Sequence, residues 1–171
     1  MNTNHIIVVP YNPKWKNEFQ KIKNEIYNAL GNLALSIEHI GSTAVVGLSA
    51  KPIIDIDVVI KNHSLLNEVI KKLKDIGYIH EGDLGIKDRD AFKYENKPHL
   101  MLHHLYVCPQ NSRELKRHIT FRDYLRNNPD DVKKYSKIKE RGAKLFPYDI
   151  EKYIEYKAEF INKIYNKISI L

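Results

Sequence analysis

The first thirty residues pair a short apolar run with a long amphipathic segment. His5–Pro10 is typical of a short strand that Pro10 ends, and Pro13 suits the first position of a helix. Apolar residues then recur at helical spacing up to Gly31, namely Trp15, Phe19, Ile22, Ile26 and Leu30. This pattern predicts a strand and then a helix that ends near Gly31 and turns its Trp and Phe stripe into the core.

Two further apolar runs flank a turn of small residues in the stretch 33–60. We expect strands over 33–40 and 53–60, with about one helical turn at 43–48 between them. Side chains alternate between the two faces of a strand, so Asp55 and Asp57 point one way while Ile54, Ile56 and Val58 point the other. The second strand therefore has one apolar face and one acidic face.

The pattern continues with a helix over 64–76, capped by Ser64 and ended by Gly77. Short strands are predicted at 78–80, 91–94 and 100–107, with a polar loop at 81–90; the last two strands pair and add to the sheet edge. In the last strand His104 shares a face with Tyr106, and His103 faces the other side. If the register is off by one residue, the two histidines exchange faces.

From Ser112 onward the pattern is helical, with breaks at Pro129 and at 146–149, and Asp149 caps the last helix. Strands dominate residues 1–110 and helices dominate 111–171. We therefore predict an α+β fold whose mixed sheet has flanking helices and a C-terminal helical segment. Residues 1–171 are interpreted as one domain, with a sheet-containing core at 1–110 and the C-terminal helices at 111–171.

Composition narrows the class of protein. Hydrophobic residues make up 43% of the 171 residues and charged residues 29%, which is ordinary for a soluble globular protein. Cys108 is the only cysteine, so an intramolecular disulfide and a cysteine-based zinc cluster within one chain are excluded. The N-terminus has no signal-peptide pattern and no run is long enough to span a membrane. We expect a cytoplasmic protein without a membrane partner.

The net charge of +7 is unevenly distributed. Residues 1–110 carry 13 Lys and Arg against 12 Asp and Glu, whereas residues 111–171 carry 15 against 9. A local excess of positive charge favours an anionic partner such as a nucleotide or RNA. The alternative is a set of lysine-rich, solvated helix faces.

Candidate chemistry centres on the two aspartates. Neighbouring carboxylates repel each other, and a divalent cation such as Mg²⁺ or Mn²⁺ with oxygen ligands would relieve that repulsion. Gly41 allows close approach of the backbone, and Ser42 with the following N–H groups can hold a phosphate. Lys51 either contacts a phosphate or is an ordinary loop lysine. We expect Asp55 and Asp57 to flank one solvent-accessible cleft and to catalyse phosphoryl or nucleotidyl transfer with the bound cation.

A set of motifs adds to this reading: HIGSTAVVGLSAKPIIDIDVVI, preceded by VVPYNPKW and followed by GDLGIKDRDAF, HHLYVC, RHITFRDYL and YKAEFI. In this order they resemble the GrpB family, a compact branch of the nucleotidyltransferase superfamily typified by DNA polymerase beta. The resemblance implies a metal-dependent nucleotidyltransferase that moves a nucleoside monophosphate from an NTP to an acceptor. That acceptor is a small-molecule hydroxyl, a protein side chain or an RNA end.

The resemblance also implies roles for residues outside the central stretch. It places Arg89 beside the site through a stretch similar to the family's GIxGR, and it favours contacts of His118 and Arg122 with phosphates. His118, Arg122 and Arg126 repeat every four residues and so share one helical face; the alternative is a solvated face. Lys157 matches a lysine of the family pattern and is expected to point at the site.

The strand 100–107 departs from the family pattern. The usual form is HHLHV, and Tyr106 stands here in place of its last histidine. Many nucleotidyltransferases supply a third carboxylate from such a strand, but MLHHLYV contains none. His104 is then the candidate third metal ligand beside Asp55 and Asp57. Two alternatives stay open: a catalytically weak or inactive nucleotide- or anion-binding module of the same fold, and a His/Asp metal-dependent hydrolase.

Overall fold

The protein, described here by a computed structural model for residues 5–169, is built on one mixed sheet. The strands lie in the order β1-β2-β5-β4-β3, with β2 and β5 parallel and the other neighbours antiparallel. Their bounds are Ser36–Ile40 for β1, Ile54–Ile60 for β2, Ile79–Gly82 for β3, Asp90–Lys93 for β4 and His103–Pro109 for β5. The mixed sheet with flanking helices confirms the predicted fold class.

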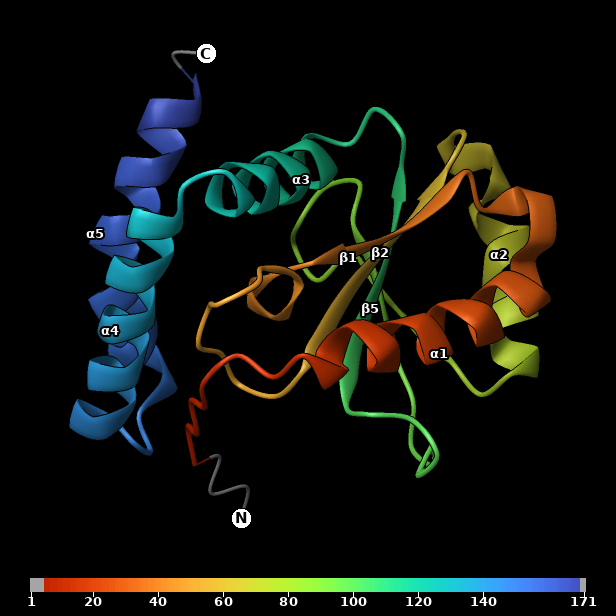
Figure 1. Cartoon of the computed structure of the whole chain (residues 1–171). Coiled ribbons are helices and arrows are strands. Elements are labelled where there is room, and N and C mark those ends of the chain that lie inside the picture. Colours follow the sequence, from red (N-terminus) through yellow and green to blue (C-terminus); the bar gives the residue numbers. More distant parts are fainter. Residues whose placement is uncertain (1–4, 170–171) are drawn as a thin grey trace.

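One face of the sheet packs against the helices α1 (Lys14–Leu30) and α2 (Leu66–Asp75), which lie together in Figure 1. The predicted stripe of α1 is buried in full, from Trp15 to Leu30. It meets the apolar side chains of β2 and β5, including Ile54, Ile56 and Leu105, in the main core. The apolar positions of the sequence thus place both helices on one side and leave the acidic face of β2 on the other.

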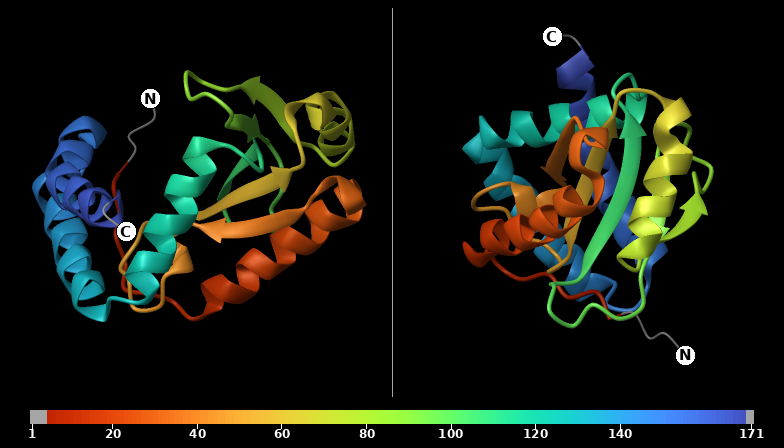
Figure 2. Two further views of the ribbon diagram at one scale, coloured as in Figure 1. Left: turned by 90° about the horizontal axis from the view of Figure 1, so that it is seen from above. Right: turned by 90° about the vertical axis from the view of Figure 1, so that its right-hand side faces the viewer.

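The opposite side carries the three C-terminal helices, α3 (Arg113–Arg126), α4 (Pro129–Leu145) and α5 (Ile150–Ser169). Helix α3 crosses the sheet face, and α4 and α5 stand side by side beyond it (Figures 1 and 2). A second core joins the loop after β1 to this helical group: Val45 and Leu48 pack with Leu125, Val132 and Tyr135. Among residues 5–169, no helix combines the length and apolar character that crossing a membrane requires.

Some element boundaries differ from the sequence prediction. The N-terminal run 5–10 forms no strand of the sheet and makes only an isolated bridge between Val9 and Ala50. Residues Gly31–Leu33 form a 3₁₀ turn, so β1 begins only at Ser36. Asn62, not Ser64, caps the next helical segment, because its side chain accepts the Ser64 N–H at 3.1 Å.

The last strand also differs from its predicted place. β5 begins at His103, and it lies in the interior of the sheet between β2 and β4 rather than at an edge. Its apolar face, which includes Leu105 and Val107, is buried in the main core, as an interior strand requires. The predicted antiparallel pairing with the strand before it is confirmed.

Candidate active site

The site begins with two rows of side chains on one sheet face. In the sheet register Asp55 lies opposite Ile40 on one side and His104 on the other, and Asp57 lies between Glu38 and Tyr106. Directly paired residues of neighbouring strands point to the same face. The prediction that His104 and Tyr106 share a face with both aspartates is therefore confirmed, and His103 is buried on the opposite face.

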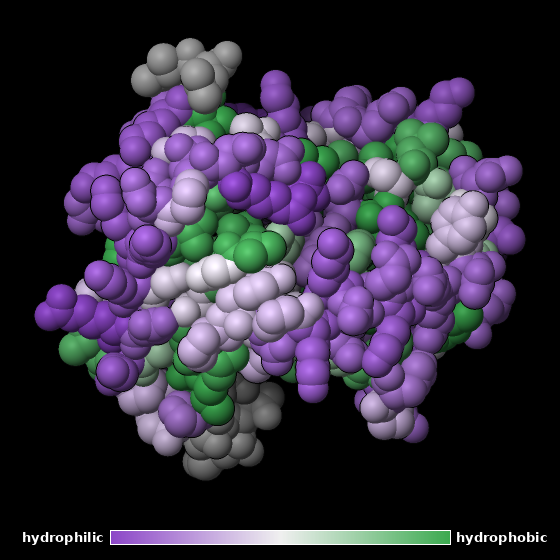
Figure 3. Space-filling model, viewed as in Figure 1, coloured by the Kyte–Doolittle hydropathy of each residue, from purple (hydrophilic) through white to green (hydrophobic). Residues whose placement is uncertain are grey.

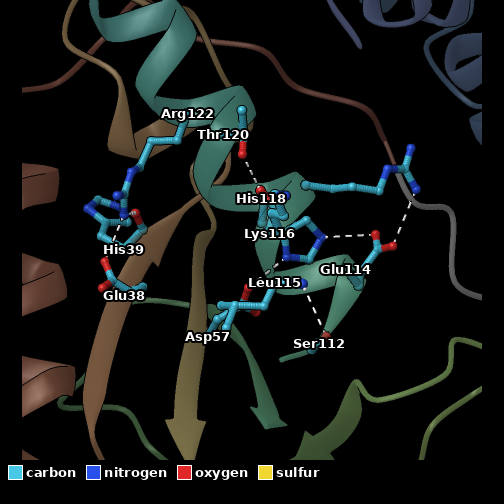
Figure 4. A network of polar contacts seen from close by, with 11 residues as sticks. Glu38, His39, Asp57, Ser112, Glu114, Leu115, Lys116, His118, Thr120 and Arg122 are labelled. Carbon is cyan, nitrogen blue, oxygen red and sulfur yellow. Dashed lines mark hydrogen bonds and ion pairs between the residues drawn. The ribbon is translucent and has the colours of Figure 1, made fainter. Parts of the chain in front are cut away.

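Helix α3 crosses this polar face, and the side chains on its inner side contact the strands. Leu115 packs on Val59 and Cys108 at the far end of the strands. One turn later, His118 Nδ1 lies 2.7 Å from Asp57 Oδ2, and its Nε2 lies 3.2 Å from Glu114 Oε1 (Figure 4). The imidazole therefore bridges a carboxylate of the sheet and a carboxylate of the helix.

The contact with His118 leaves Asp57 more buried than the sequence predicts. The Asp57 side chain is 0% exposed, whereas that of Asp55 is 30% exposed. Solvent therefore reaches Asp55 but not Asp57, over which His118 of α3 lies, so the two aspartates do not flank one solvent-accessible cleft as predicted. Burial acts against the charged ring, but the hydrogen bond to Asp57 together with the negative charges of Asp57 and Glu114 raises the pKa of His118.

The free oxygens of the two aspartates suit a divalent cation. Asp57 Oδ1 is buried and has no hydrogen-bond partner among the described residues. Asp55 Oδ2 lies against Gly41, where an added Cβ would come within 2.5 Å of it. Gly41 has φ +73°, so a residue with a side chain is excluded both by conformation and by space. Carboxylate oxygens of this kind are hard donors that suit Mg²⁺ or Mn²⁺.

His104 is placed beside Asp55 and not as part of a ready-made cluster. Its Nδ1 lies 2.9 Å from Asp55 Oδ1, and its side chain is 53% exposed. Within residues 5–169 no three His, Cys, Asp or Glu side chains gather in a way that could hold a metal ion. The geometry thus gives His104 a contact with a candidate ligand, which orients that carboxylate.

A group of three lysines, Lys51, Lys139 and Lys157, lies next to Asp55 and Ser42; we call it the lysine cluster. Lys139 of α4 is only 4% exposed and its Nζ donates to Ser42 Oγ. Lys157 of α5 has its Nζ 4.5 Å from the ring centroid of Tyr153, and Lys51 approaches the same ring at 5.9 Å. Two helices and one loop thus bring positive charge to the Gly41-Ser42 turn.

The electrostatics of the lysine cluster suit an anionic ligand. Burial lowers the pKa of Lys139 well below its ordinary value, and the neighbouring Lys157 lowers it further. Burial, together with Lys51, lowers the pKa of Lys157 to about 8. None of the three lysines forms an ion pair within 4 Å with a carboxylate of the described residues. Asp55 attracts Lys139 and Lys157 without forming an ion pair, and because buried cations are costly, a polyphosphate would stabilise the cluster.

Arg89 lies at the other end of the site. Its guanidinium carbon stands 4.3 Å from the ring centroid of Tyr106, and its buried Nε has no hydrogen-bond partner among the described residues. The loop that presents it contains two non-glycine residues with positive φ, Leu84 and Asp88. Arg89 is therefore held over the polar sheet face with an unused donor.

Arg122 was predicted to contact a phosphate, but its guanidinium already donates hydrogen bonds within the protein. Its guanidinium donates to Glu38 Oε2 at 2.9 Å and to the His39 carbonyl at 3.1 Å (Figure 4), and its Nε donates to Asp123 Oδ1 at 2.9 Å. His39 is likewise structural, since its buried ring stacks on Phe19 and bonds the hydroxyl of Thr43. Arg122 thus connects α3 to β1. On the predicted common face, His118 and Arg122 meet the sheet, while Arg126 donates to the Ala44 carbonyl in the turn after β1.

Lys139 is the site residue that sequence reasoning missed. A lysine within a lysine-rich helix is normally exposed, which hid its role. A signal is nevertheless present, because Lys139 falls on the buried stripe of α4, formed by Val132, Tyr135, Ser136, Lys139 and Gly142. A lysine on the buried stripe of an amphipathic helix is unusual enough to mark a candidate binding residue.

Comparison with known proteins places this geometry in a family. The model of the GrpB family, described as "GrpB protein", matches residues 5–167. The UPF0157 protein YqkA of Bacillus subtilis is 34% identical over 155 residues, which are 90% of this chain and 44% of that protein, so the chain spans less than half of this relative.

Solved structures agree with this assignment. The crystal structure of the conserved protein GrpB from Enterococcus faecalis superposes with a TM-score of 0.83 at 34% identity, covering 95% of this chain and 96% of that one. The Cid1 poly(U) polymerase bound to MgATP gives a TM-score of 0.52 at 11% identity over 78% of this chain and 45% of that one, which shows a common nucleotidyltransferase-type fold. With its family model matched over nearly its whole length, the chain belongs to the GrpB family.

Proposed function

We propose that this protein is a metal-dependent nucleotidyltransferase that transfers a nucleoside monophosphate from an NTP to an acceptor hydroxyl. The observation that carries the proposal is the position of the lysine cluster beside Ser42 and the aspartate pair. Positive side chains for a polyphosphate and carboxylate oxygens for a cation are the two parts that this chemistry needs. The likeness to the Cid1 poly(U) polymerase, a protein solved with MgATP, supports the same reading at the level of the fold.

In the proposed reaction, the acceptor oxygen forms a bond to the α-phosphorus while the bond from that phosphorus to the bridging oxygen of pyrophosphate breaks. The hydroxyl proton leaves to solvent, and pyrophosphate departs with the electron pair of the broken bond. Asp55 and Asp57 would hold a divalent cation, which neutralises charge on the phosphates and orients them. Ser42 and the lysine cluster would bind the outer phosphates and stabilise the departing pyrophosphate.

His104 and Arg89 would act around this centre. His104 would keep the Asp55 carboxylate oriented through its 2.9 Å contact. Arg89 would offer its free Nε to the α-phosphate or to an acidic group of the acceptor. The acceptor is a small molecule, a protein side chain or an RNA end.

A second candidate, a nucleotide-binding module without turnover, is favoured by one specific observation. The neighbours of Asp55 and Asp57 on β5 are His104 and Tyr106, so this strand contributes no third carboxylate. Burial raises the pKa of the Tyr106 phenol, with a further contribution from Asp55, which makes the phenol a poor metal ligand at neutral pH.

Turnover with NTPs labelled at the α-phosphate separates the two candidates. The nucleotidyltransferase predicts pyrophosphate release and transfer of label to acceptors from a cell extract when Mg²⁺ or Mn²⁺ is present. The variant Lys157→Met should lose this activity, whereas Lys137→Met, an exposed lysine of α4, should keep it. Binding of NTP without any release of pyrophosphate would reject the enzyme in favour of the module.

A further inference from the structure

The outer face of α3 forms a groove that the candidate active site does not use. The groove has a volume of about 1220 Å³ and runs between α3 and the C-terminal half of α5. Its α3 residues recur every three or four positions, from Arg113 through Lys116 and Thr120 to Asn127, so they share one side of the helix. His118 and Arg122 lie on the other side, against the sheet, so α3 separates the groove from the site.

Positive charge dominates the lining of this groove. Arg113, Lys116 and Arg117 line it, and Asp123 is its single acidic residue among those described. The Asp123 carboxylate is already bound by Arg122 Nε at 2.9 Å, which offsets its charge. Arg113 and Lys116 are exposed and form no ion pair within residues 5–169, whereas Arg117 Nη1 lies 3.3 Å from Glu114 Oε2. The groove is therefore complementary to a chain of negative charges.

The groove also offers flat, stackable surfaces. The guanidinium carbon of Arg117 lies 4.5 Å from the ring centroid of Tyr165, which is on α5. The Tyr165 ring in turn lies 5.1 Å from Phe121, which holds it in place. Guanidinium planes and aromatic rings of this kind stack on unpaired bases.

Two amide groups at the end of the groove add acceptors of hydrogen bonds. Asn127 and Asn128 donate through Nδ2 to the carbonyls of Asp123 and Tyr124, both at 2.7 Å. These contacts fix the amides and leave their carbonyl oxygens without a partner among the described residues. A carbonyl oxygen accepts a hydrogen bond from a 2′-hydroxyl, which only RNA provides.

We propose that the groove between α3 and α5 binds single-stranded RNA, with Arg113, Lys116 and Arg117 on the phosphates, a base stacked at Arg117 and Tyr165, and the asparagine oxygens on 2′-hydroxyls. An acidic peptide would meet the same positive charges, but it would not use the stacked pair. This surface is separate from Asp55 and the lysine cluster, so its role does not depend on the proposed transfer reaction.

The test is fluorescence anisotropy of a labelled, unstructured RNA over a series of salt concentrations. The groove variant Arg113→Gln, Lys116→Gln, Arg117→Gln should bind at least tenfold more weakly than wild type. It should also reduce the slope of log affinity against log salt by about 2, since each phosphate contact on a single strand contributes about 0.7. The variant Tyr165→Leu should weaken binding without changing that slope. Both variants should keep the thermal stability of wild type within a few degrees.

A matched control removes the same charge elsewhere. The variant Lys71→Gln, Lys72→Gln, Lys74→Gln changes α2, at the opposite end of the molecule from α5 (Figures 1 and 2), and should bind RNA within twofold of wild type. Lys157→Met, in the lysine cluster, should also leave RNA binding unchanged, so a failed transfer reaction and a failed groove give different results.

Three outcomes would overturn the proposal. An equal loss in the α2 control would show that only overall charge matters. Binding of polyglutamate as tight as that of RNA would make the groove a surface for acidic proteins. Binding of DNA of the same sequence as tight as that of RNA would remove the role of the asparagine oxygens and of the 2′-hydroxyl.

Discussion

At the scale of single residues, Lys139 shows how function and stability oppose each other in this protein. Its ammonium is 4% exposed and its one hydrogen bond goes to the neutral hydroxyl of Ser42. A buried charge without a counter-ion destabilises the folded state. Retaining such a lysine makes physical sense when an anionic ligand completes its surroundings.

Lys139→Met should therefore stabilise the protein and abolish phosphate binding. Methionine has a similar length and an apolar, flexible side chain that suits a buried position. We expect a gain of about 1 kcal/mol, or about 2–4 °C in Tm for a chain of this size. Thermal unfolding and calorimetric titration with inorganic triphosphate give the two numbers. A lower Tm together with undiminished triphosphate affinity would remove Lys139 from the site.

Lys139, which is buried, and Lys157, which is half-buried, also predict how stability depends on pH. The pKa of Lys157 is about 8 in the folded protein and that of Lys139 is lowered too, whereas an unfolded lysine has a pKa near ~10.4. Between those values the unfolded chain binds more protons, so the free energy of unfolding rises with pH from about 8 to about 10. This contribution is lost as pH falls through the folded pKa.

Triphosphate affinity should change in the opposite direction, because it needs the charged lysines. It should fall as pH rises above about 8, in titrations read by calorimetry in buffers of matched ionic strength. The variant Lys157→Met should show a weaker pH dependence of stability in the same range. An affinity that stays constant from pH 7 to about 10 would contradict the role of the lysine cluster.

Residue-level prediction from sequence reached some of this site and not the rest. Alternation along a strand placed Asp55, Asp57, His104 and Tyr106 on one face, because that rule depends only on local geometry. The burial of Asp57 under His118 depends on where α3 lies over the sheet, across 61 residues of sequence, and no local pattern gives that. The burial of Lys139 likewise depends on how α4 packs in the folded protein, so no local pattern assigned it to the site.

At the scale of elements, the position of α4 and α5 against the loop after β1 decides where the lysines point. The Ser49 backbone N–H donates to Ser136 Oγ at 3.0 Å, and the Ser49 hydroxyl donates to Glu140 at 2.6 Å. These contacts hold α4 over the loop that contains Ser42. The N-terminal run joins no strand of the sheet and instead contacts loops: the Ile6 N–H donates to the Pro147 carbonyl at 2.8 Å, and Val9 bridges Ala50.

Gly142 controls the distance between α4 and α5. A Cβ at this position would come within 2.9 Å of a Tyr156 ring atom and 3.1 Å of a Tyr153 ring atom. Glycine to alanine in a helix normally stabilises by about 1 kcal/mol. Here Gly142→Ala should instead destabilise by about 1–3 kcal/mol, the usual cost of overpacking.

The same substitution should weaken triphosphate binding, because it would displace the Tyr153 ring, over which the Lys157 Nζ lies. Chemical denaturation and the calorimetric titration measure the two effects. As a comparison at a solvent-facing position of the same helix, Lys137→Ala should leave both quantities near the wild-type values. A stabilised Gly142→Ala protein would show that the two helices are not closely packed there.

At the scale of the whole molecule, the two faces of the sheet differ in polarity and in how they are covered. One is a closed apolar core under α1 and α2, and the other is a polar face partly covered by α3. In the view of Figure 3 the surface is largely hydrophilic, and hydrophobic side chains reach it in separate small groups. The fold class was predictable because apolar periodicity determines which side of each helix and strand faces the core. The order of the strands was not predictable in this way: β5 was expected at the edge of the sheet and lies inside it.

Part of the positive charge of residues 111–171 lies at two separate places in the folded molecule. Lys139 and Lys157 turn inward to the candidate active site, while Arg113, Lys116 and Arg117 face the groove on the far side of α3. The sequence left two interpretations of this charge, an anionic partner or solvated helix faces, and it did not predict that the charges separate. Helix α3 is the element that separates them.

The most direct test of the central claim is calorimetric titration of the protein with an NTP, with and without Mg²⁺. Wild type should bind the NTP more tightly with Mg²⁺, and the variant Asp55→Asn, Asp57→Asn should lose this dependence while staying folded. The exposed control Asp75→Asn should behave like wild type. We expect the double variant to bind at least 100-fold more weakly with Mg²⁺, which corresponds to about 3 kcal/mol. If it binds Mg·NTP like wild type, the aspartate pair does not form the active site.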